Sequence, residues 1–266
     1  MGLSIYRTED GSDTVYNPDF DEHYHNRHGA ISESEHVFFE ALGIQQALTR
    51  QRPIRLFETG FGTGLNLLLL LRYCKQYNFR GSIFYHTVEA FPLDAKLFNR
   101  LNMEESFTYT PWVARIFENL QSGFNSFYFA DGFELNLTIY RGYMDSLDYP
   151  STTPLFDFIW HDAFAPETNT ELWNHRVFGK LYRLSSDRCL LSTYAASSSA
   201  RAGMCAAGWY VARRPGALGK REMTLAAKHP RLLEGHKLVN KERLAQRYRN
   251  MEFITHPAHR SPSTSG

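Results

Sequence analysis

The sequence predicts an α/β fold with a doubly wound, mainly parallel sheet, and three observations support this. Apolar runs typical of buried strands alternate with segments of helical periodicity along most of the chain. A glycine-rich turn from Gly60 to Gly64 follows the first apolar strand and precedes a helix. Acidic residues stand at the ends of three strands, at the sheet edge where such folds bind ligands.

The N-terminal half begins with residues 1–30, which are polar and rich in turn residues, so we expect a hairpin or an extended arm. The following elements, in order, are a helix over 32–48, a strand over 54–57, the glycine turn, a helix over about 65–77, a strand over 82–91 and a helix over 92–101. Residues 103–130 contain many aromatic residues without clean periodicity, and we interpret them as an insertion.

The C-terminal half predicts more alternating elements. They are a strand from 133 that stops at Asp145, a buried strand from 155 that ends at Asp162, a helix over 171–186, a strand over 188–195, a helix over 198–209 and a final hairpin from 209–215 and 221–228. Strands that alternate with helices in this way build a doubly wound, mainly parallel sheet, in which the final strand can run antiparallel to its neighbour.

Composition is that of an ordinary globular protein, with 43% hydrophobic and 21% charged residues. The formal net charge of +1 excludes a global basic field, so any nucleic-acid surface must be a local patch. Cys74, Cys189 and Cys205 are too far apart in sequence for a zinc or disulfide framework, and we expect buried thiols. No signal pattern or membrane-spanning run is present, which indicates a cytoplasmic protein without a membrane partner.

The glycine spacing favours one cofactor over another. Gly60, Gly62 and Gly64 alternate behind Glu58, whereas a nicotinamide-binding turn has two residues between its second and third glycines. The alternating spacing after an acidic residue is typical of S-adenosylmethionine sites. We expect the glycines to let the backbone approach the ligand closely, because a Cβ atom there would clash.

Three strand-end carboxylates complete the predicted ligand site. Glu89 follows the second core strand, where a carboxylate can accept hydrogen bonds from both ribose hydroxyls. Asp145 could accept from the adenine amino group, although a turn-forming aspartate is an equal alternative. Asp162 ends the most apolar strand and faces whatever lies beyond the cofactor, so it is the candidate catalytic residue.

Longer segments resemble a known family. "ETGFGTGLN", "VEAFPL", "DFIWHDAFAPETNTELW", "STYAASSSARAGMCAAGW" and "GKREM" together resemble the methyltransferase half of the tRNA wobble-uridine enzyme MnmC, which also exists in a stand-alone form. The resemblance runs from about Tyr16 to Ala227. Two departures are Ala163, where the family often has glycine, and "SSDRC", which lacks the usual glycine pair.

The resemblance implies the class I S-adenosylmethionine methyltransferase (Rossmann-like) fold, with an N-terminal arm and a basic C-terminal tail. It implies methylation of 5-aminomethyl-2-thiouridine to 5-methylaminomethyl-2-thiouridine at the tRNA wobble position, with S-adenosylmethionine as the cofactor. By position, the cofactor residues are Glu58, Gly60, Phe61, Gly62, Gly64, Asn66, Glu89 and Asp145, and Asp162 lies at the methyl acceptor. We expect the stand-alone form, which depends on other enzymes to install the aminomethyl group.

A wobble base must be splayed out of a single-stranded loop, commonly onto an aromatic or guanidinium plane. The candidate substrate contacts are Tyr24, Glu33, Phe164, Tyr194, Lys220 and Arg221, with His36 and Trp173 as weaker ones. Arg213, Arg214, Lys220 and Arg221 form a basic patch that suits the phosphates of an anticodon stem-loop. His23, His25 and His28 lie close together in sequence, but their spacing does not favour a metal site, and we expect this arm to border the acceptor pocket instead.

We divide the chain into residues 1–50 as an arm and helix, 51–228 as the methyltransferase domain and 229–266 as a basic, partly disordered tail. The tail from Lys228 contains eight Lys or Arg against three Glu. Three alternatives stay open from the residues alone: a small-molecule amine methyltransferase, a polyamine aminopropyltransferase and a non-catalytic nucleotide-binding module. The oligomeric state is not predicted.

Overall fold

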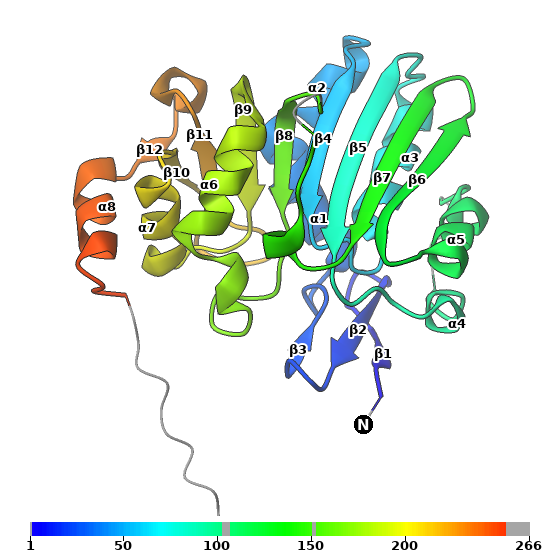
Figure 1. Ribbon diagram of the computed structural model, residues 1–266. Coiled ribbons are helices and arrows are strands. Elements are labelled where there is room, and N and C mark those ends of the chain that lie inside the picture. Colours follow the sequence, from blue (N-terminus) through cyan, green and yellow to red (C-terminus); the bar gives the residue numbers. More distant parts are fainter. Residues whose placement is uncertain (1, 103–106, 151–152, 254–266) are drawn as a thin grey trace, which may run out of the picture.

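The computed structural model describes residues 2–102, 107–150 and 153–253 (Figure 1). Within these residues the main sheet has nine strands in the order β12-β10-β11-β9-β8-β4-β5-β7-β6. The strands are β4 (Ile54–Thr59), β5 (Ser82–Glu89), β6 (Gly123–Ala130), β7 (Glu134–Arg141), β8 (Phe156–His161), β9 (Ser185–Thr193), β10 (Tyr210–Arg214), β11 (Met223–Ala227) and β12 (Lys237–Leu238).

The five central strands, from β9 to β7, are parallel, and the strands at both edges pair antiparallel. The prediction of a doubly wound, mainly parallel sheet is therefore confirmed. The helices are α1 (Ala30–Ser34), α2 (Ile44–Thr49), α3 (Leu65–Gln76), α4 (Ala95–Phe98), α5 (Thr110–Asn119), α6 (His175–Leu184), α7 (Ser198–Ala206) and α8 (Lys241–Arg249).

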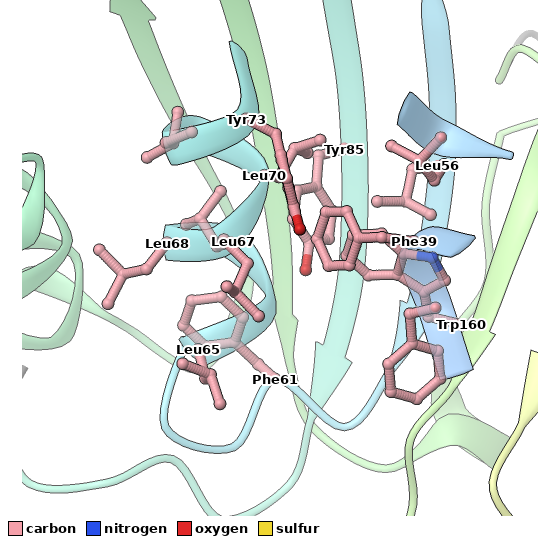
Figure 2. Close-up of a cluster of buried hydrophobic side chains, with 14 of the residues drawn as sticks. Phe39, Leu56, Phe61, Leu65, Leu67, Leu68, Leu70, Tyr73, Tyr85 and Trp160 are labelled. Atoms are coloured by element: carbon pink, nitrogen blue, oxygen red, sulfur yellow. The ribbon is translucent and has the colours of Figure 1, made fainter. Parts of the chain in front are cut away.

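Two hydrophobic cores cover the two faces of the sheet, because successive side chains of a strand point to opposite faces. On β4, Leu56 faces the core shared with α3, whereas Phe57 faces the core shared with α6 and α7. Figure 2 shows the first core, where Phe39 and Trp160 pack with ring centroids 5.0 Å apart beside the leucines of α3. This packing fixes the start of α3 and hence the glycine turn before it.

The N-terminal residues form a small antiparallel sheet of β1 (Ser4–Arg7), β2 (Asp13–Asn17) and β3 (Glu22–His23), as predicted for a hairpin. Figure 1 shows this sheet below one end of the main sheet. His25 Nε2 lies 2.7 Å from Thr63 Oγ1, so the segment after β3 is attached to the glycine turn. The arm therefore lies at the carboxyl ends of the parallel strands.

Several predicted elements are wrong in their bounds. The helix expected over 32–48 begins at Ala30, passes through a π-helical turn (Glu35–Glu40) and breaks at Gly43, whose φ is +70°. The helix expected over 92–101 is the single turn of α4. Residues 103–130, which we interpreted as an insertion, include α5 and also β6, whose aromatic residues on both faces obscure the strand alternation. Residues 103–106 lie outside the described residues.

The strand expected to stop at Asp145 ends at Arg141, and Asp145 lies in a short 3₁₀ turn (Met144–Ser146). Lys180 Nζ on α6 donates to the carbonyls of Met144, Asp145 and Leu147 at 2.8–2.9 Å. A cation from a distant helix thus satisfies these carbonyls. The local alternation of apolar residues before Asp145 does not reveal this contact with Lys180.

Part of the expected tail belongs to the folded structure. β12 pairs with β10, and α8 packs against α7. Lys241 Nζ donates to the Gly208 carbonyl at 2.6 Å, which holds the start of α8 to the end of α7. The expected disorder of residues 254–266 falls outside the described residues. No helix in the described residues is long and apolar enough to cross a membrane.

Candidate functional site

A cavity of about 630 Å³ lies at the carboxyl ends of β4, β5 and β8, within the ~300–1,000 Å³ range of small-molecule sites. Its wall is formed by the arm, the glycine turn, the ends of β5, β7, β8 and β9, and the loop between β10 and β11. Predicted site residues that line it are Tyr24, Glu33, Gly60, Phe61, Gly62, Asn66, Glu89, Asp145, Asp162, Phe164, Tyr194 and Lys220.

The glycine turn needs glycine for reasons within the fold. Gly60 has φ +88°, and a Cβ there would lie 2.5 Å from the Asp162 carbonyl oxygen. Gly62 has φ +53°, and its Cβ would lie 3.2 Å from the Tyr24 ring. Gly64 starts α3 with φ +74°; it faces Val113 and neighbouring rings and does not line the cavity.

The Glu89 carboxylate is held at the wall of the cavity by the backbone. Its two oxygens accept from Gly62 N at 2.9 Å and Phe91 N at 2.8 Å. Burial raises its pKa, although these hydrogen bonds oppose the shift. Such a carboxylate can accept two hydroxyl groups of a ribose, and Asp145 is exposed at the rim nearby.

Glu58 lies beneath the cavity and does not line it, which corrects its expected place in the cofactor loop. Only 1% of the residue is exposed. Its carboxylate accepts from Asn66 Nδ2 at 2.9 Å, Tyr85 Oη at 2.7 Å and Thr87 Oγ1 at 3.1 Å. Burial outweighs these bonds and raises its pKa to about 7.

Asp162 follows β8 directly and lines the cavity. Its Oδ2 accepts from Asn66 Nδ2 at 2.8 Å, so one amide group bridges Asp162 and Glu58. Its backbone N donates to the Thr59 carbonyl at 2.9 Å, which fixes the residue beside β4. Burial first, and then the neighbouring Glu58 carboxylate, hold the pKa of Asp162 well above its usual range. The carboxylate can therefore take and hold a proton.

Aromatic side chains border Asp162. Tyr24 and Phe164 contact edge to face with centroids 5.0 Å apart, and Tyr194 Oη donates to the Ala163 carbonyl at 2.8 Å. Trp173 is buried instead, and its Nε1 donates to the Phe164 carbonyl at 2.7 Å. Trp173 therefore supports the loop after Asp162 and does not face the cavity.

Arg221 does not line the cavity. Together with Arg213 and the start of α7 it lines a neighbouring groove of about 520 Å³, which shares Tyr194 and Lys220 with the cavity. His36 also lies apart, where its Nε2 donates to the Pro215 carbonyl at 2.9 Å. The expected substrate contacts therefore lie in the cavity and the adjoining groove, except His36 and Trp173, which line neither.

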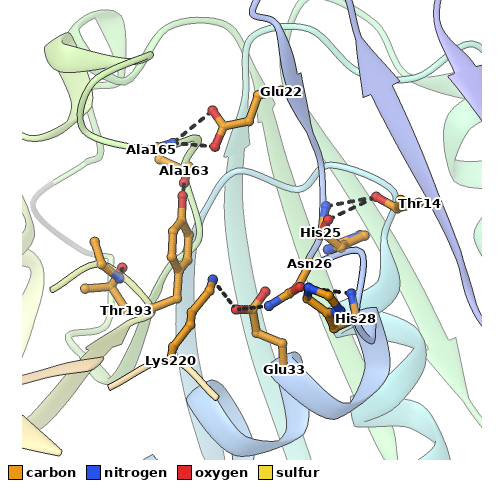
Figure 3. A network of polar contacts seen from close by, with 12 residues as sticks. Thr14, Glu22, His25, Asn26, His28, Glu33, Ala163, Ala165, Thr193 and Lys220 are labelled. Carbon is orange, nitrogen blue, oxygen red and sulfur yellow. Dashed lines mark hydrogen bonds and ion pairs between the residues drawn. The ribbon is translucent and has the colours of Figure 1, made fainter. Parts of the chain in front are cut away.

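Sequence reasoning missed several residues from the arm that line the cavity, among them Phe20, Glu22 and His25. Glu22 accepts from Ala165 N at 3.1 and 3.2 Å, so it holds the loop after Asp162 (Figure 3). Burial lowers the pKa of His25 to about 4. The contact between Glu22 and Ala165 joins residues 143 positions apart, and no local pattern predicts it.

The structure also describes the cysteines and the residues that could bind a metal ion or the cofactor. All three cysteines are buried and free, as predicted. In the part of the chain that the structure describes, no group of three or more His, Cys, Asp or Glu is arranged to hold a metal ion. The cavity fits S-adenosylmethionine chemically, because Gly60 and Gly62 of the glycine turn line it together with the Glu89 carboxylate and Asn66, whose buried Oδ1 has no partner.

Comparison with known proteins agrees with this geometry. Residues 87–229 match a family described as S-adenosyl-L-methionine-dependent methyltransferase. The "tRNA 5-methylaminomethyl-2-thiouridine biosynthesis bifunctional protein MnmC" of Cupriavidus necator is 31% identical over 223 residues, which are 81% of this chain and 33% of that protein. The MnmC protein of Magnetococcus marinus is 33% identical over 215 residues, 79% of this chain and 32% of that protein.

The chain thus spans about a third of the length of these curated relatives. Among solved structures, the crystal structure of MNMC2 from Aquifex aeolicus has a TM-score of 0.71 and 23% identity. The match covers 92% of this chain and 75% of that one. At this identity the match establishes a shared fold.

Proposed function

Because the chain belongs to the S-adenosyl-L-methionine-dependent methyltransferase family, we propose that it N-methylates 5-aminomethyl-2-thiouridine at the tRNA wobble position, giving 5-methylaminomethyl-2-thiouridine. Its similarity to proteins named for 5-methylaminomethyl-2-thiouridine biosynthesis supports this substrate. The main structural support is the Asp162 carboxylate, which lines the same cavity as the glycine turn and Glu89. Family membership sets aside the polyamine aminopropyltransferase and the non-catalytic nucleotide-binding module.

On this proposal, Gly60, Phe61, Gly62 and Asn66 surround the amino-acid part of the cofactor, and Glu89 accepts the ribose hydroxyls. Asp145, at the exposed rim, accepts from the adenine amino group. Glu58 acts from below through Asn66, whose amide it holds at 2.9 Å. When bound, S-adenosylmethionine supplies a methyl carbon that its sulfonium makes electrophilic, and the electron pair of the broken C–S bond stays on sulfur.

The acceptor amine is mostly protonated at neutral pH, since a lysine-like amine has a pKa of about 10.4. Only the neutral amine attacks, so one N–H bond must break first. We propose that Asp162 takes this proton on a carboxylate oxygen, while Asn66 keeps the carboxylate in place. The raised pKa of Asp162 suits this role, because a stronger base removes the proton more readily.

We propose that Tyr24, Phe164 and Tyr194 receive the splayed-out base, since base–aromatic stacking suits a single-stranded loop. Arg221 and Arg213 in the neighbouring groove contact the phosphates of the anticodon stem-loop. Other enzymes install the aminomethyl precursor before this step, and the reaction takes place in the cytoplasm, where tRNA is modified.

The test is a reaction of the pure protein with S-adenosylmethionine and tRNA from cells that lack this modification, followed by mass analysis of the wobble nucleoside. We expect 5-methylaminomethyl-2-thiouridine, and a loss of about 10²–10⁴-fold in rate for Asp162→Asn. This variant keeps the size of the side chain and its bond from Asn66, so cofactor binding should persist. Methylation of small amines but not of tRNA would contradict the proposal and favour a small-molecule methyltransferase.

A further inference from the structure

A lysine ammonium of the chain itself lies at the mouth of the cavity. Lys220 Nζ donates to Glu33 Oε1 at 2.6 Å and lies 4.8 Å from the centroid of the Tyr194 ring (Figure 3 labels Lys220 and Glu33). Asn26 Nδ2 also donates to Glu33 Oε1, at 3.3 Å. The carboxylate is thus oriented by a second group, and only 12% of the Glu33 side chain is exposed.

These contacts are those that recognise a primary alkylammonium. A carboxylate supplies a charge-assisted hydrogen bond, and an aromatic face attracts the cation. The lysine side chain ends in a methylene and an ammonium group, and so does the aminomethyl group of the proposed acceptor. A site that holds one can therefore hold the other.

The position of this site relative to Asp162 supports the same conclusion. Burial and Glu58 dominate the raised pKa of Asp162, but Glu33 also raises it and Lys220 lowers it, so both groups lie within electrostatic range. An ammonium that replaces that of Lys220 would sit beside the proton acceptor. The total charge around Asp162 would also be unchanged by the exchange.

The surroundings of Lys220 allow another ammonium group to displace it from Glu33. It lies in the loop over 215–222 between β10 and β11, in which Leu218 and Gly219 both have positive φ. Its side chain is 42% exposed, and ion pairs at this exposure add little stability. The same loop reaches the neighbouring groove, so a displaced Lys220 stays close to the expected phosphate contacts.

We propose that Glu33 and the face of Tyr194 form the binding site for the acceptor's ammonium group, and that Lys220 occupies this site until substrate displaces it. The inference rests on the proposed function, since it takes a primary alkylamine as the acceptor. Glu33 is then a specificity-determining residue, and Lys220 is an internal competitor of the substrate. The proton still leaves the nitrogen to Asp162.

The test measures binding of the free nucleoside 5-aminomethyl-2-thiouridine, which has no phosphate, in the presence of S-adenosylhomocysteine. Lys220→Met should tighten binding about two- to fivefold, the range that a half-exposed ion pair can supply. Glu33→Gln should weaken nucleoside binding at least tenfold. In a protein that already carries Glu33→Gln, Lys220→Met should not tighten nucleoside binding. Lys237→Met, which removes an exposed cation of β12 outside both the cavity and the groove, is the control and should leave nucleoside binding unchanged.

A second readout is the acetylation rate of Lys220, followed by mass spectrometry. The aminomethyl nucleoside should raise the rate by releasing the ammonium, whereas 2-thiouridine, which lacks the amine, should not. Unchanged nucleoside affinity in Lys220→Met, together with weaker tRNA binding, would overturn the inference and make Lys220 a phosphate contact. Wild-type methylation of tRNA separates the two failures, because its absence refutes the proposed function itself.

Discussion

Replacing Glu58 by glutamine should move the acid limb of the pH–rate profile to lower pH. Asn66 Nδ2 lies 2.9 Å from Glu58 Oε1 and 2.8 Å from Asp162 Oδ2, so the two carboxylate oxygens are less than about 6 Å apart. At an effective dielectric constant of about 20, two unit charges at about 6 Å repel by about 3 kcal/mol. This energy corresponds to about 2 pKa units.

The direction of the shift in the acid limb follows from which ionisation state of Asp162 is destabilised by Glu58. An ionised Glu58 disfavours the ionised form of Asp162, so the wild-type carboxyl holds its proton to a higher pH. With a neutral glutamine, Asp162 ionises at lower pH, and methyl transfer should persist to lower pH by up to about 2 units. The fold should tolerate the change, because the hydroxyls of Tyr85 and Thr87 can accept from the glutamine amide where they now donate.

The assay is single-turnover methylation of tRNA between pH 5 and 9, with cofactor affinity and thermal stability measured on the same samples. An acid limb that stays in place, or moves to higher pH, in a variant with normal cofactor binding would refute the electrostatic coupling between Glu58 and Asp162. A variant with lower activity at every pH and an unshifted limb would show instead that Glu58 only supports Asn66.

Three further predictions concern stability and RNA binding. Burial raises the pKa of Glu58 from 4.5 to about 7, so its contribution to stability is full below about pH 4.5 and is lost as pH rises through about 7. Denaturant titrations at stepped pH should show a fall on the order of 3 kcal/mol that is absent in Glu58→Gln. Gly60→Ala should cost more than about 2 kcal/mol, since its Cβ would meet a carbonyl at 2.5 Å, and thermal melts should show a smaller loss for Gly219→Ala, which has φ +80° but no neighbour within 4 Å. Arg213→Gln and Arg221→Gln should each lower the salt slope of tRNA binding by about 0.7; equal slopes in filter binding would remove the groove from the RNA interface.

The elements that could be predicted from sequence are those with a local cause. Strand β4, the glycine turn and α3 follow from a buried run, three glycines and a helical leucine pattern, and the structure places them as expected. Asp162 and Glu89 fall at strand ends for the same reason, since Asp162 directly follows β8 and Glu89 is the last residue of β5. Strand β6 was missed because aromatic residues occur on both of its faces and hide the alternation. The helical spacing of Val113, Ile116 and Phe117 in α5 is present in the sequence and was overlooked.

The sequence by itself determined the order of elements, the positive-φ glycine turn and the carboxylates that follow the buried strands, because each depends on residues that are neighbours along the chain. Only the tertiary structure decided that Glu58 lies beneath the cavity and that Lys220 meets Glu33 across 187 positions. These contacts depend on how the sheet stacks distant segments at one edge. Hydrogen bonding and burial at that edge depend on how distant segments pack in three dimensions, and a local sequence pattern does not carry this information.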